Sequence, residues 1–443
     1  MLFSSFEFLF LFLPVTLAVW LLVPPRGRFL VLLAASLVFY AFGEPIFVLL
    51  LVGSALVHWL LGRLAERRAV GVWLAVAFDL LLLVFFKYYD RASTLFAFPA
   101  LGLFLPLGIS FYSFTLLSYV IDVRCGEPSE RSFFRFAAYA LAFPKLLSGP
   151  ITRYGSVRGS LLAPRVTFDR AAHGIGRFVC GLSKKLLLAV PASEMWSYLR
   201  ALEGGERGVL GSWLALVFFS FWLYYDFSGY TDMALGVGEI FGLSLPENFD
   251  YPYTAESPRD FWRRWHITLS VWFRDYVYIP LGGNRRGAWR TLFNLLAVWL
   301  LTGLWHGSTL NFVIWGLYWF VLLGLERAFK GRLSFPRALR RALMLPLILI
   351  SWLIFAFEDL GEGASFLRTL AFGAPWTALS LYELARNAVL LSVLVLGATP
   401  LPKRLFEKRE GRLAKAFLCL FGFLLSLAYL AGGTHQPFLY LKF

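Results

Sequence analysis

The sequence predicts an all-α polytopic membrane protein with roughly 11 to 13 membrane segments, and three observations support this fold class. The 443-residue chain has a mean hydropathy of +0.67. Hydrophobic residues make up 59% of it and charged residues only 16%, against about 25% charged residues in soluble globular domains. Glycine, proline and charged residues divide the chain into apolar runs that approach a spanning helix in length, about 20 residues.

The first apolar run, Ser5 to Val23, is predicted to be a retained spanning helix. Glu7 stands where a secretory signal carries basic residues, and no small-residue cleavage site precedes Pro24 and Pro25. Further segments, some of them re-entrant, are predicted near residues 28–43, 45–62, 70–88, 101–121, 133–149, 171–190, 209–225, 290–304, 311–326, 341–357, 381–399 and 415–431. No internal repeat is detectable, so residues 1–443 are predicted to form a single polytopic domain.

The basic residues alternate between the two sides of the predicted membrane. The connections after the first, third and fifth segments carry eight of them: Arg26, Arg28, Arg63, Arg67, Arg68, Arg124, Arg131 and Arg135. The two intervening connections carry only two, Lys87 and Arg91. This positive-inside bias places the N-terminus outside the cytoplasm. The net charge of +15 therefore does not indicate nucleic-acid binding.

Two longer connections are predicted in the second half of the chain. The stretch from Ser193 to Gly211 contains EGGERGVLG and is expected to be an extramembrane loop. The stretch from Leu401 to Lys415 is expected to be a basic connection between two late helices.

The stretch RRWHITLSVWFRDYVYIPLGGNRRG, from Arg263 to Gly287, mixes arginine and histidine with aromatic residues. From Asp260 to Tyr278 the spacing predicts one amphipathic helix, with Ser257 as its N-cap. Its aromatic and apolar face, which also holds His266, consists of Trp262, Trp265, Leu269, Trp272, Phe273 and Tyr276. Such a helix suits a membrane interface, but an interfacial anchor does not explain a histidine among tryptophans.

A second histidine lies in LLTGLWHGSTLNFVIWG, from Leu300 to Gly316. His306 stands between two apolar segments, with Gly303 and Gly307 on either side. This pattern predicts a side chain at a helix break, where small neighbours allow close approach of another chain segment or a substrate. A hydrogen-bonded core histidine is the alternative, so the pattern alone leaves catalysis open.

Metal and nucleophile chemistry have little support in the sequence. His266 and His306 are not on adjacent turns, and no HExxH motif is present. Cys125, Cys180 and Cys419 show no CxxC spacing, which argues against a disulfide framework or a zinc site. No GxSxG elbow is present. Imidazole acting as a general base remains, a role that suits its ordinary pKa of about 6.5.

Two carboxylates are unusual so close to an apolar segment. Asp226 and Asp232 are predicted to position substrate or to orient an imidazole. Pairing with an intramembrane cation is the alternative, and the candidates are Lys145, Lys184 and Lys185.

Several long motifs resemble the membrane-bound O-acyltransferase family, and within it the bacterial branch of the alginate O-acetyltransferase membrane subunit. They are FSSFEFLFLFLP, FPKLLSGPITRY, YYDFSGYTDMALGVGEIFGLSLPENFDYPY, DFWRRWHITLSVWFRDYVYIPLGGNRRG, LTGLWHGSTLNFVIWG and the ending PFLYLKF. The resemblance implies that His306 is the catalytic residue and that His266 holds the second polar position of the active site. It also implies a ring of helices around a central tunnel, in a protein of the bacterial cytoplasmic (inner) membrane.

The resemblance further implies acyl transfer without a metal or a permanently bound cofactor. Acetyl-CoA is the expected donor on the cytoplasmic side. The acetyl group is expected to reach an extracytoplasmic polysaccharide by relay through a periplasmic acetyltransferase partner, with direct transfer to the polysaccharide hydroxyl as the alternative. Membrane lipids surround the chain. The residues expected to contact substrate are Asp226, Trp265, Trp305, Arg285 and Arg286. For Arg285 and Arg286 a positive-inside loop is the alternative. D-alanyl transfer to teichoic acid, and a transporter or channel, are the competing functions.

Overall fold

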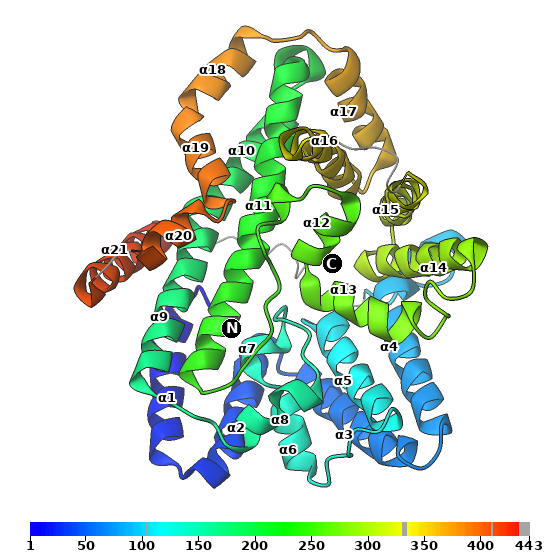
Figure 1. The fold of residues 1–443 in the computed structure, drawn as a ribbon, viewed down its shortest axis with the longest axis vertical. Helices are drawn as coiled ribbons and strands as arrows, with labels where there is room; N and C mark the ends of the chain where they lie inside the picture. Colours follow the sequence, from blue (N-terminus) through cyan, green and yellow to red (C-terminus); the bar gives the residue numbers. More distant parts are fainter. Residues whose placement is uncertain (103, 330–334, 409–410, 434–443) are drawn as a thin grey trace. The chain divides into compact units, whose positions relative to one another are not determined.

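The computed structural model describes residues 1–102, 104–329, 335–408 and 411–433. Every regular element in these ranges is a helix (Figure 1). The chain divides into two compact units. Among the described residues the first unit comprises Met1–Leu182 and Tyr230–Glu247, and the second comprises Ser183–Gly229 and 248–433.

The first unit contains most of the early predicted segments. Its helices are η1 (Phe8–Phe12), α1 (Leu13–Leu22), η2 (Pro25–Gly27), α2 (Arg28–Ala41), α3 (Phe47–Ala65), α4 (Val70–Phe96), α5 (Ile109–Arg124), α6 (Phe133–Ala140), α7 (Phe143–Leu146), α8 (Tyr154–Leu162) and α9 (Phe168–Ser183). The segment predicted near 133–149 is split into α6 and α7, and Pro144 stands in the first turn of α7. Inside this unit His58 Nε2 lies 3.1 Å from Asp79 Oδ2, which joins α3 to α4.

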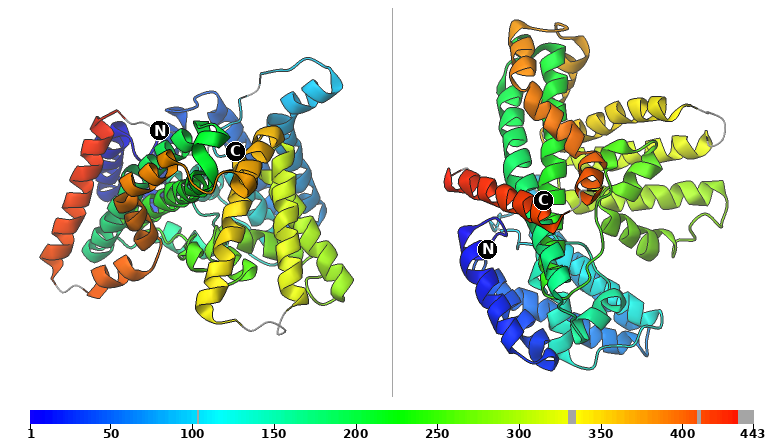
Figure 2. Two further views of the ribbon diagram at one scale, coloured as in Figure 1. Left: turned by 90° about the horizontal axis from the view of Figure 1, so that it is seen from above. Right: turned by 60° about the vertical axis from the view of Figure 1, so that its left-hand side comes forward.

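The second unit contains the remaining helices. They are η3 (Lys184–Ala189), α10 (Val190–Ala201), α11 (Gly204–Ile240, which ends in the first unit), η4 (Pro252–Thr254), α12 (Pro258–Arg264), α13 (Ile267–Phe273), η5 (Arg274–Tyr278), α14 (Ala288–His306), α15 (Leu310–Ala328), α16 (Arg337–Ala356), α17 (Leu360–Phe372), α18 (Ala378–Arg386), α19 (Ala388–Gly397), α20 (Leu401–Lys408) and α21 (Arg412–Ala431). Figure 2 shows α14, α15 and α16 lying side by side.

The prediction of a long loop from Ser193 to Gly211 is wrong, because most of this stretch is helical. Helix α10 continues to Ala201 and α11 begins at Gly204. The Arg207 side chain explains this tight connection, since it donates hydrogen bonds to the carbonyl oxygens of Arg200 and Leu202 at 3.1 and 3.0 Å. These bonds satisfy carbonyls at the end of α10 that have no partner within the helix. The backbone is extended at Leu202, between the two helices, and inside α11 it leaves helical geometry at Gly208, whose φ is 62°.

The connection predicted from Leu401 to Lys415 is also partly helical. It includes α20, and α21 begins at Arg412. Lys403 and Glu407, one turn apart, lie 3.9 Å from each other on α20. The prediction missed this helix because a short polar helix has no apolar run to mark it.

Six helices among the described residues are long and apolar enough to cross a membrane, or seven if the pair α18 and α19, bent by 58°, counts as one span. The six lie at Phe47–Ala65, Val70–Thr94, Gly204–Ile240, Leu310–Ala328, Arg337–Ala356 and Leu413–Ala431. Several of the other predicted segments form shorter or broken helices. The polytopic all-α class is therefore confirmed, with fewer full-length spans than the apolar runs predict.

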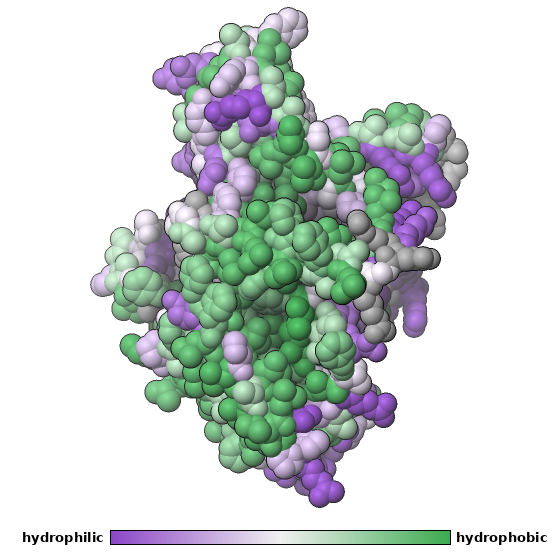
Figure 3. Space-filling view, turned by 90° about the vertical axis from the view of Figure 1, so that its left-hand side faces the viewer, coloured by the Kyte–Doolittle hydropathy of each residue, from purple (hydrophilic) through white to green (hydrophobic). Residues whose placement is uncertain are grey.

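The surface is apolar enough to face hydrocarbon. On the face shown in Figure 3, hydrophobic side chains cover most of the area. In the first unit Leu22 and Trp73 are 84% and 70% exposed, and in the second unit Leu413 is 88% exposed. Water-soluble monomers rarely expose contiguous apolar surface on this scale, whereas lipid tails cover it at no cost.

Candidate functional site

The stretch that begins at Asp260 is a broken helix, which corrects the prediction of one amphipathic helix to Tyr278. Ser257 caps α12 as predicted, because its Oγ accepts a hydrogen bond from the Asp260 amide at 3.2 Å. Helix α12 then ends at Arg264, and the backbone at Trp265 is extended. His266 takes a left-handed conformation with φ 45° and ψ 54°, and α13 begins after it at Ile267.

Asn248 explains how the chain tolerates this break. Its carbonyl oxygen accepts from the Ile267 amide at 3.0 Å. Its Oδ1 accepts from the Thr268 amide at 3.1 Å and from the Thr268 hydroxyl at 2.9 Å. The same Oδ1 lies 3.1 Å from His266 Nδ1. A left-handed non-glycine residue is strained by about 1–3 kcal/mol, and these bonds hold it in place.

The contact with Asn248 also fixes the tautomer of His266. The Thr268 amide can only donate, so the Asn248 atom facing it is the amide oxygen. His266 Nδ1 must therefore carry a hydrogen to bond that same oxygen. Burial lowers the pKa of the His266 imidazole to about 3, so the ring is neutral at physiological pH. Its Nε2 atom is consequently a hydrogen-bond acceptor.

His306 is the last residue of α14, as the sequence predicted for a helix break. Gly307 follows in an extended conformation and serves as the C-cap. The imidazole is buried among aromatic rings, with 3% of the residue exposed. Its ring centroid lies 4.7 Å from Trp305, 5.0 Å from Trp315 and 5.3 Å from Phe355.

The predicted close approach at the glycines is confirmed, and the approaching segment is α15. A Cβ atom added to Gly303 would lie 2.4 Å from the Phe312 carbonyl oxygen. Asn311, at the start of α15, donates to the Ile354 carbonyl oxygen near the end of α16 at 3.3 Å. His306 therefore lies where the end of α14, the start of α15 and the end of α16 come together.

Trp305 connects the two histidines within the second unit. Its ring centroid lies 6.4 Å from that of His266 and 4.7 Å from that of His306. Trp265 joins the same cluster through Trp352, at 4.9 Å, and Trp352 lies 5.9 Å from Phe355. The structure thus brings together four of the predicted site residues, which are His266, His306, Trp265 and Trp305.

Asp226 is held by a cation, the alternative that the sequence left open. Lys185 Nζ lies 2.6 Å from Asp226 Oδ1, and both side chains are buried in the second unit. The following residue, Phe227, packs its ring edge-on to His266 with centroids 4.9 Å apart. Asp226 is therefore one residue from the histidine cluster, with a structural partner of its own.

The other two charged candidates have different partners, both in the first unit. Asp232 is bonded by Arg177, whose Nη2 lies 3.1 Å from Oδ1. Lys145 donates to the Ala140 carbonyl oxygen at 3.2 Å and lies 4.6 Å from the centre of the Tyr139 ring. Arg177 was not predicted, because it stands inside the segment predicted near 171–190 with no distinctive motif around it.

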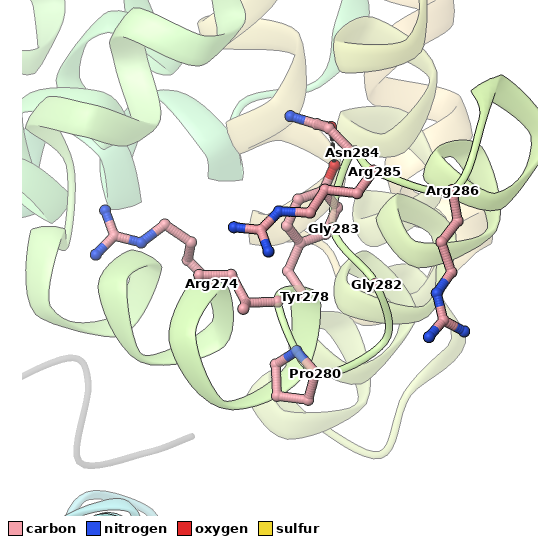
Figure 4. Close-up of a pocket in the computed structure, with 9 residues that line it drawn as sticks. Arg274, Tyr278, Pro280, Gly282, Gly283, Asn284, Arg285 and Arg286 are labelled. Atoms are coloured by element: carbon pink, nitrogen blue, oxygen red, sulfur yellow. Dashed lines mark hydrogen bonds between the residues drawn. The ribbon is translucent and has the colours of Figure 1, made fainter. Parts of the chain in front are cut away.

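Arg285 and Arg286 lie in the turn between η5 and α14, beside a cavity of about 500 Å³. Figure 4 shows Arg274 and Arg285 extending to the same side of this turn, whereas Arg286 lies on the other side of Gly282. Asn284 anchors the turn, because its Oδ1 accepts from the Tyr278 hydroxyl at 2.5 Å and from Arg327 at 3.0 Å. Arg274 is also ion-paired with Asp275, at 2.6 Å.

A family model described as the membrane-bound O-acyltransferase family matches residues 101–358. A probable alginate O-acetylase, AlgI, of Pseudomonas aeruginosa is 40% identical over 381 residues, which cover 81% of this chain and 73% of that protein. A peptidoglycan O-acetyltransferase of Helicobacter pylori is 32% identical over 83% of this chain and 79% of that protein. A teichoic acid D-alanyltransferase of Bacillus subtilis is 33% identical over 49% of this chain and 58% of that protein.

Proposed function

Because this chain belongs to the membrane-bound O-acyltransferase family, we propose that it moves an acetyl group from a cytoplasmic thioester toward an extracytoplasmic polysaccharide. The family and the named relatives make the chain an O-acyltransferase. The observation that carries the proposed mechanism is the buried cluster in which Trp305 contacts both His266 and His306.

His306 is the proposed general base. In this reaction a hydroxyl oxygen attacks the thioester carbonyl carbon, the carbon–sulfur bond breaks, and the thiol leaves with a proton. A neutral imidazole can take the hydroxyl proton and return it to the departing sulfur. The ring of aromatic side chains around His306 keeps bulk water out, which limits hydrolysis of the thioester.

His266 is the proposed orienting residue for the attacking hydroxyl. The hydrogen on its Nδ1 is bonded to Asn248. Nε2 therefore carries no hydrogen and can only accept a hydrogen bond. An acceptor cannot donate to a developing oxyanion. We therefore propose that His266 accepts a hydrogen bond from the attacking hydroxyl group. Backbone N–H groups are expected to stabilise the oxyanion.

Acetyl-CoA is the proposed donor, and Arg285 is its proposed phosphate ligand together with Arg274. Guanidinium groups bind phosphate through paired, charge-assisted hydrogen bonds. The two side chains reach the same side of the turn (Figure 4), which supports joint binding of one anion. Arg286 packs against Gly282, because a Cβ on that glycine would lie 3.0 Å from Arg286 Cδ. We therefore assign Arg286 no direct role in donor binding.

The proposed acceptor is a periplasmic acetyltransferase partner that passes the acetyl group to the polysaccharide. The names of two relatives support acetylation of a polymer, since one is a probable alginate O-acetylase and the other a peptidoglycan O-acetyltransferase. We further propose that the chain lies in the bacterial cytoplasmic membrane with its N-terminus outside, as the positive-inside bias predicts. D-alanyl transfer has narrower support, because the teichoic acid D-alanyltransferase matches only 49% of the chain.

The test uses purified protein in proteoliposomes with acetyl-CoA labelled in its acetyl group. Label should pass to a component of a periplasmic extract, and D-alanine loaded on a carrier protein should not substitute for it. Transfer of D-alanine with no transfer of acetyl would overturn the acetyl assignment while leaving the acyltransferase chemistry intact. Label reaching the polymer without any protein component of the extract would overturn the relay.

A further inference from the structure

A second hollow in the second unit lies between α12, α13, α14 and α15, with a volume of about 450 Å³. Its walls are apolar and include Ile267, Leu295, Val298, Trp299 and Leu323. Four arginines also line it: Arg259, Arg263, Arg274 and Arg327. One hollow therefore combines a hydrophobic interior with strong positive charge.

The hollow runs along the helices from a polar end into an apolar one. On α14 its lining residues extend from Leu295 to Thr302, and seven residues of α-helix span about 10 Å. On α15 they are Leu323 and Arg327, with Arg327 in the last turn of that helix. Helix α15 is long and apolar enough to span a membrane, so Arg327 at its end marks headgroup level and Leu323, one turn earlier, lies toward the hydrocarbon.

Three of the four arginines that line this hollow have no carboxylate partner among the described residues. Among the described residues, the guanidinium groups of Arg259, Arg263 and Arg327 form no ion pair with a carboxylate; Arg327 donates only to Asn284. Arg274 alone is paired, with Asp275 at 2.6 Å. Glu326, the acid next to Arg327 in the chain, accepts hydrogen bonds from the Ser257 hydroxyl and the Arg259 amide. These neutral donors leave its charge in place, so it offsets at most one of the three positive charges.

Some arginines elsewhere in the second unit have acidic partners. Arg340 and Arg341 share Glu256 at 2.6 and 3.2 Å, and Arg264 binds Asp260 at 2.9 Å. Arg259, Arg263 and Arg327, by contrast, have no such partner among the described residues and line the same hollow. An anionic ligand would complement this positive charge.

We infer that the hollow binds an anionic phospholipid, with its phosphate among Arg259, Arg263 and Arg327 and an acyl chain along Val298, Trp299 and Leu323. The apolar walls favour a lipid over free phosphate, which would leave them exposed to water. An electroneutral lipid would leave the arginine charge uncompensated. This inference does not rest on the proposed function, because it concerns lipid binding and not acetyl transfer.

The test measures lipid binding to the delipidated full chain by native mass spectrometry, using phosphatidylglycerol and phosphatidylethanolamine with identical acyl chains. Phosphatidylglycerol should bind more tightly. Each of Arg263→Gln and Arg259→Gln should weaken that binding about fivefold, because a basic residue near an anionic headgroup contributes roughly 1 kcal/mol. Arg341→Gln, a matched control outside the hollow and paired with Glu256, should bind like the unmodified protein.

A second variant tests the apolar half of the site. Val298→Trp fills the hollow and should weaken phosphatidylglycerol binding without changing the migration of the protein as a single folded species. Three results would overturn the inference. They are equal binding of the two lipids, equal losses in Arg263→Gln and Arg341→Gln, and displacement of the lipid from the unmodified protein by inorganic phosphate or coenzyme A.

Discussion

Lys185 Nζ lies 2.6 Å from Asp226 Oδ1, and the two side chains are 5% and 4% exposed. A buried pair of this kind is costly to break, because removing one partner leaves an uncompensated charge in an apolar environment. The pair therefore gives Asp226 a structural role next to the histidine cluster, through its neighbour Phe227.

Asp226→Asn is predicted to destabilise the second unit by about 3–5 kcal/mol, because Lys185 is left without its counter-ion. Thermal melting in detergent would measure the change. The double variant Lys185→Met/Asp226→Leu removes both charges and should recover most of the loss. Equal destabilisation in the single and double variants would show that the charge pair is not the cause.

Gly303→Ala is predicted to force α14 and α15 apart, because the new Cβ would lie 2.4 Å from the Phe312 carbonyl oxygen. Both stability and acyl transfer should fall, since His306 is one turn further along α14. Gly324→Ala on α15 is the matched control, as its Cβ would meet only Leu292 at 3.8 Å. If the two variants melted at the same temperature, the close helix contact would not matter.

Asn248 is a positioning residue whose oxygen sets the His266 tautomer. Asn248→Leu should lower kcat by about tenfold or more, because it removes the bond that orients His266 and so disturbs the acid–base geometry. Asn248→Asp retains the acceptor oxygen and should restore part of the rate, with a shifted pH profile because the carboxylate favours a protonated imidazole. A purely packing role would give no shift in that profile.

Stability should fall below neutral pH because of His266, which lies outside the six candidate spans. Its pKa is lowered to about 3 in the folded chain, whereas an unfolded histidine has a pKa of about 6.5. The unfolded state therefore binds the extra proton between these values. The contribution of His266 to the free energy of unfolding is complete above about pH 6.5. Below that pH it declines by about 1.4 kcal/mol per pH unit. Melting curves of His266→Gln should show a shallower decline between pH 7 and pH 5.

The sequence predicted the fold class and singled out His266 and His306 as candidate site residues, because both features leave strong local signals. Apolar runs bounded by glycine, proline and charge mark spanning helices, and a histidine between glycines marks the end of α14. The capping role of Ser257 was predicted for the same reason, since an N-cap depends on residues three positions apart.

The break at His266 was not predictable from periodicity. The apolar spacing continues through Trp265 and Leu269, but Asn248, eighteen residues earlier, binds the amide and side chain of Thr268 and draws the backbone out of the helix. The Arg177 partner of Asp232 has the same origin, whereas Lys185, the partner of Asp226, was one of the three candidate cations that the sequence offered. The break and the Arg177 pair each depend on a contact between distant residues, and such contacts leave no pattern within either segment.

The most direct test of the central claim compares acetyl transfer by the unmodified protein and by His306→Ala in proteoliposomes. His173→Ala is the matched control, because His173 is an exposed histidine of the first unit that pairs with Glu239. With folding checked by melting temperature, His306→Ala should lose about 10²-fold or more of the rate, and His173→Ala should keep it. A folded His306→Ala that transfers acetyl at the unmodified rate would contradict the assignment of His306 as the general base.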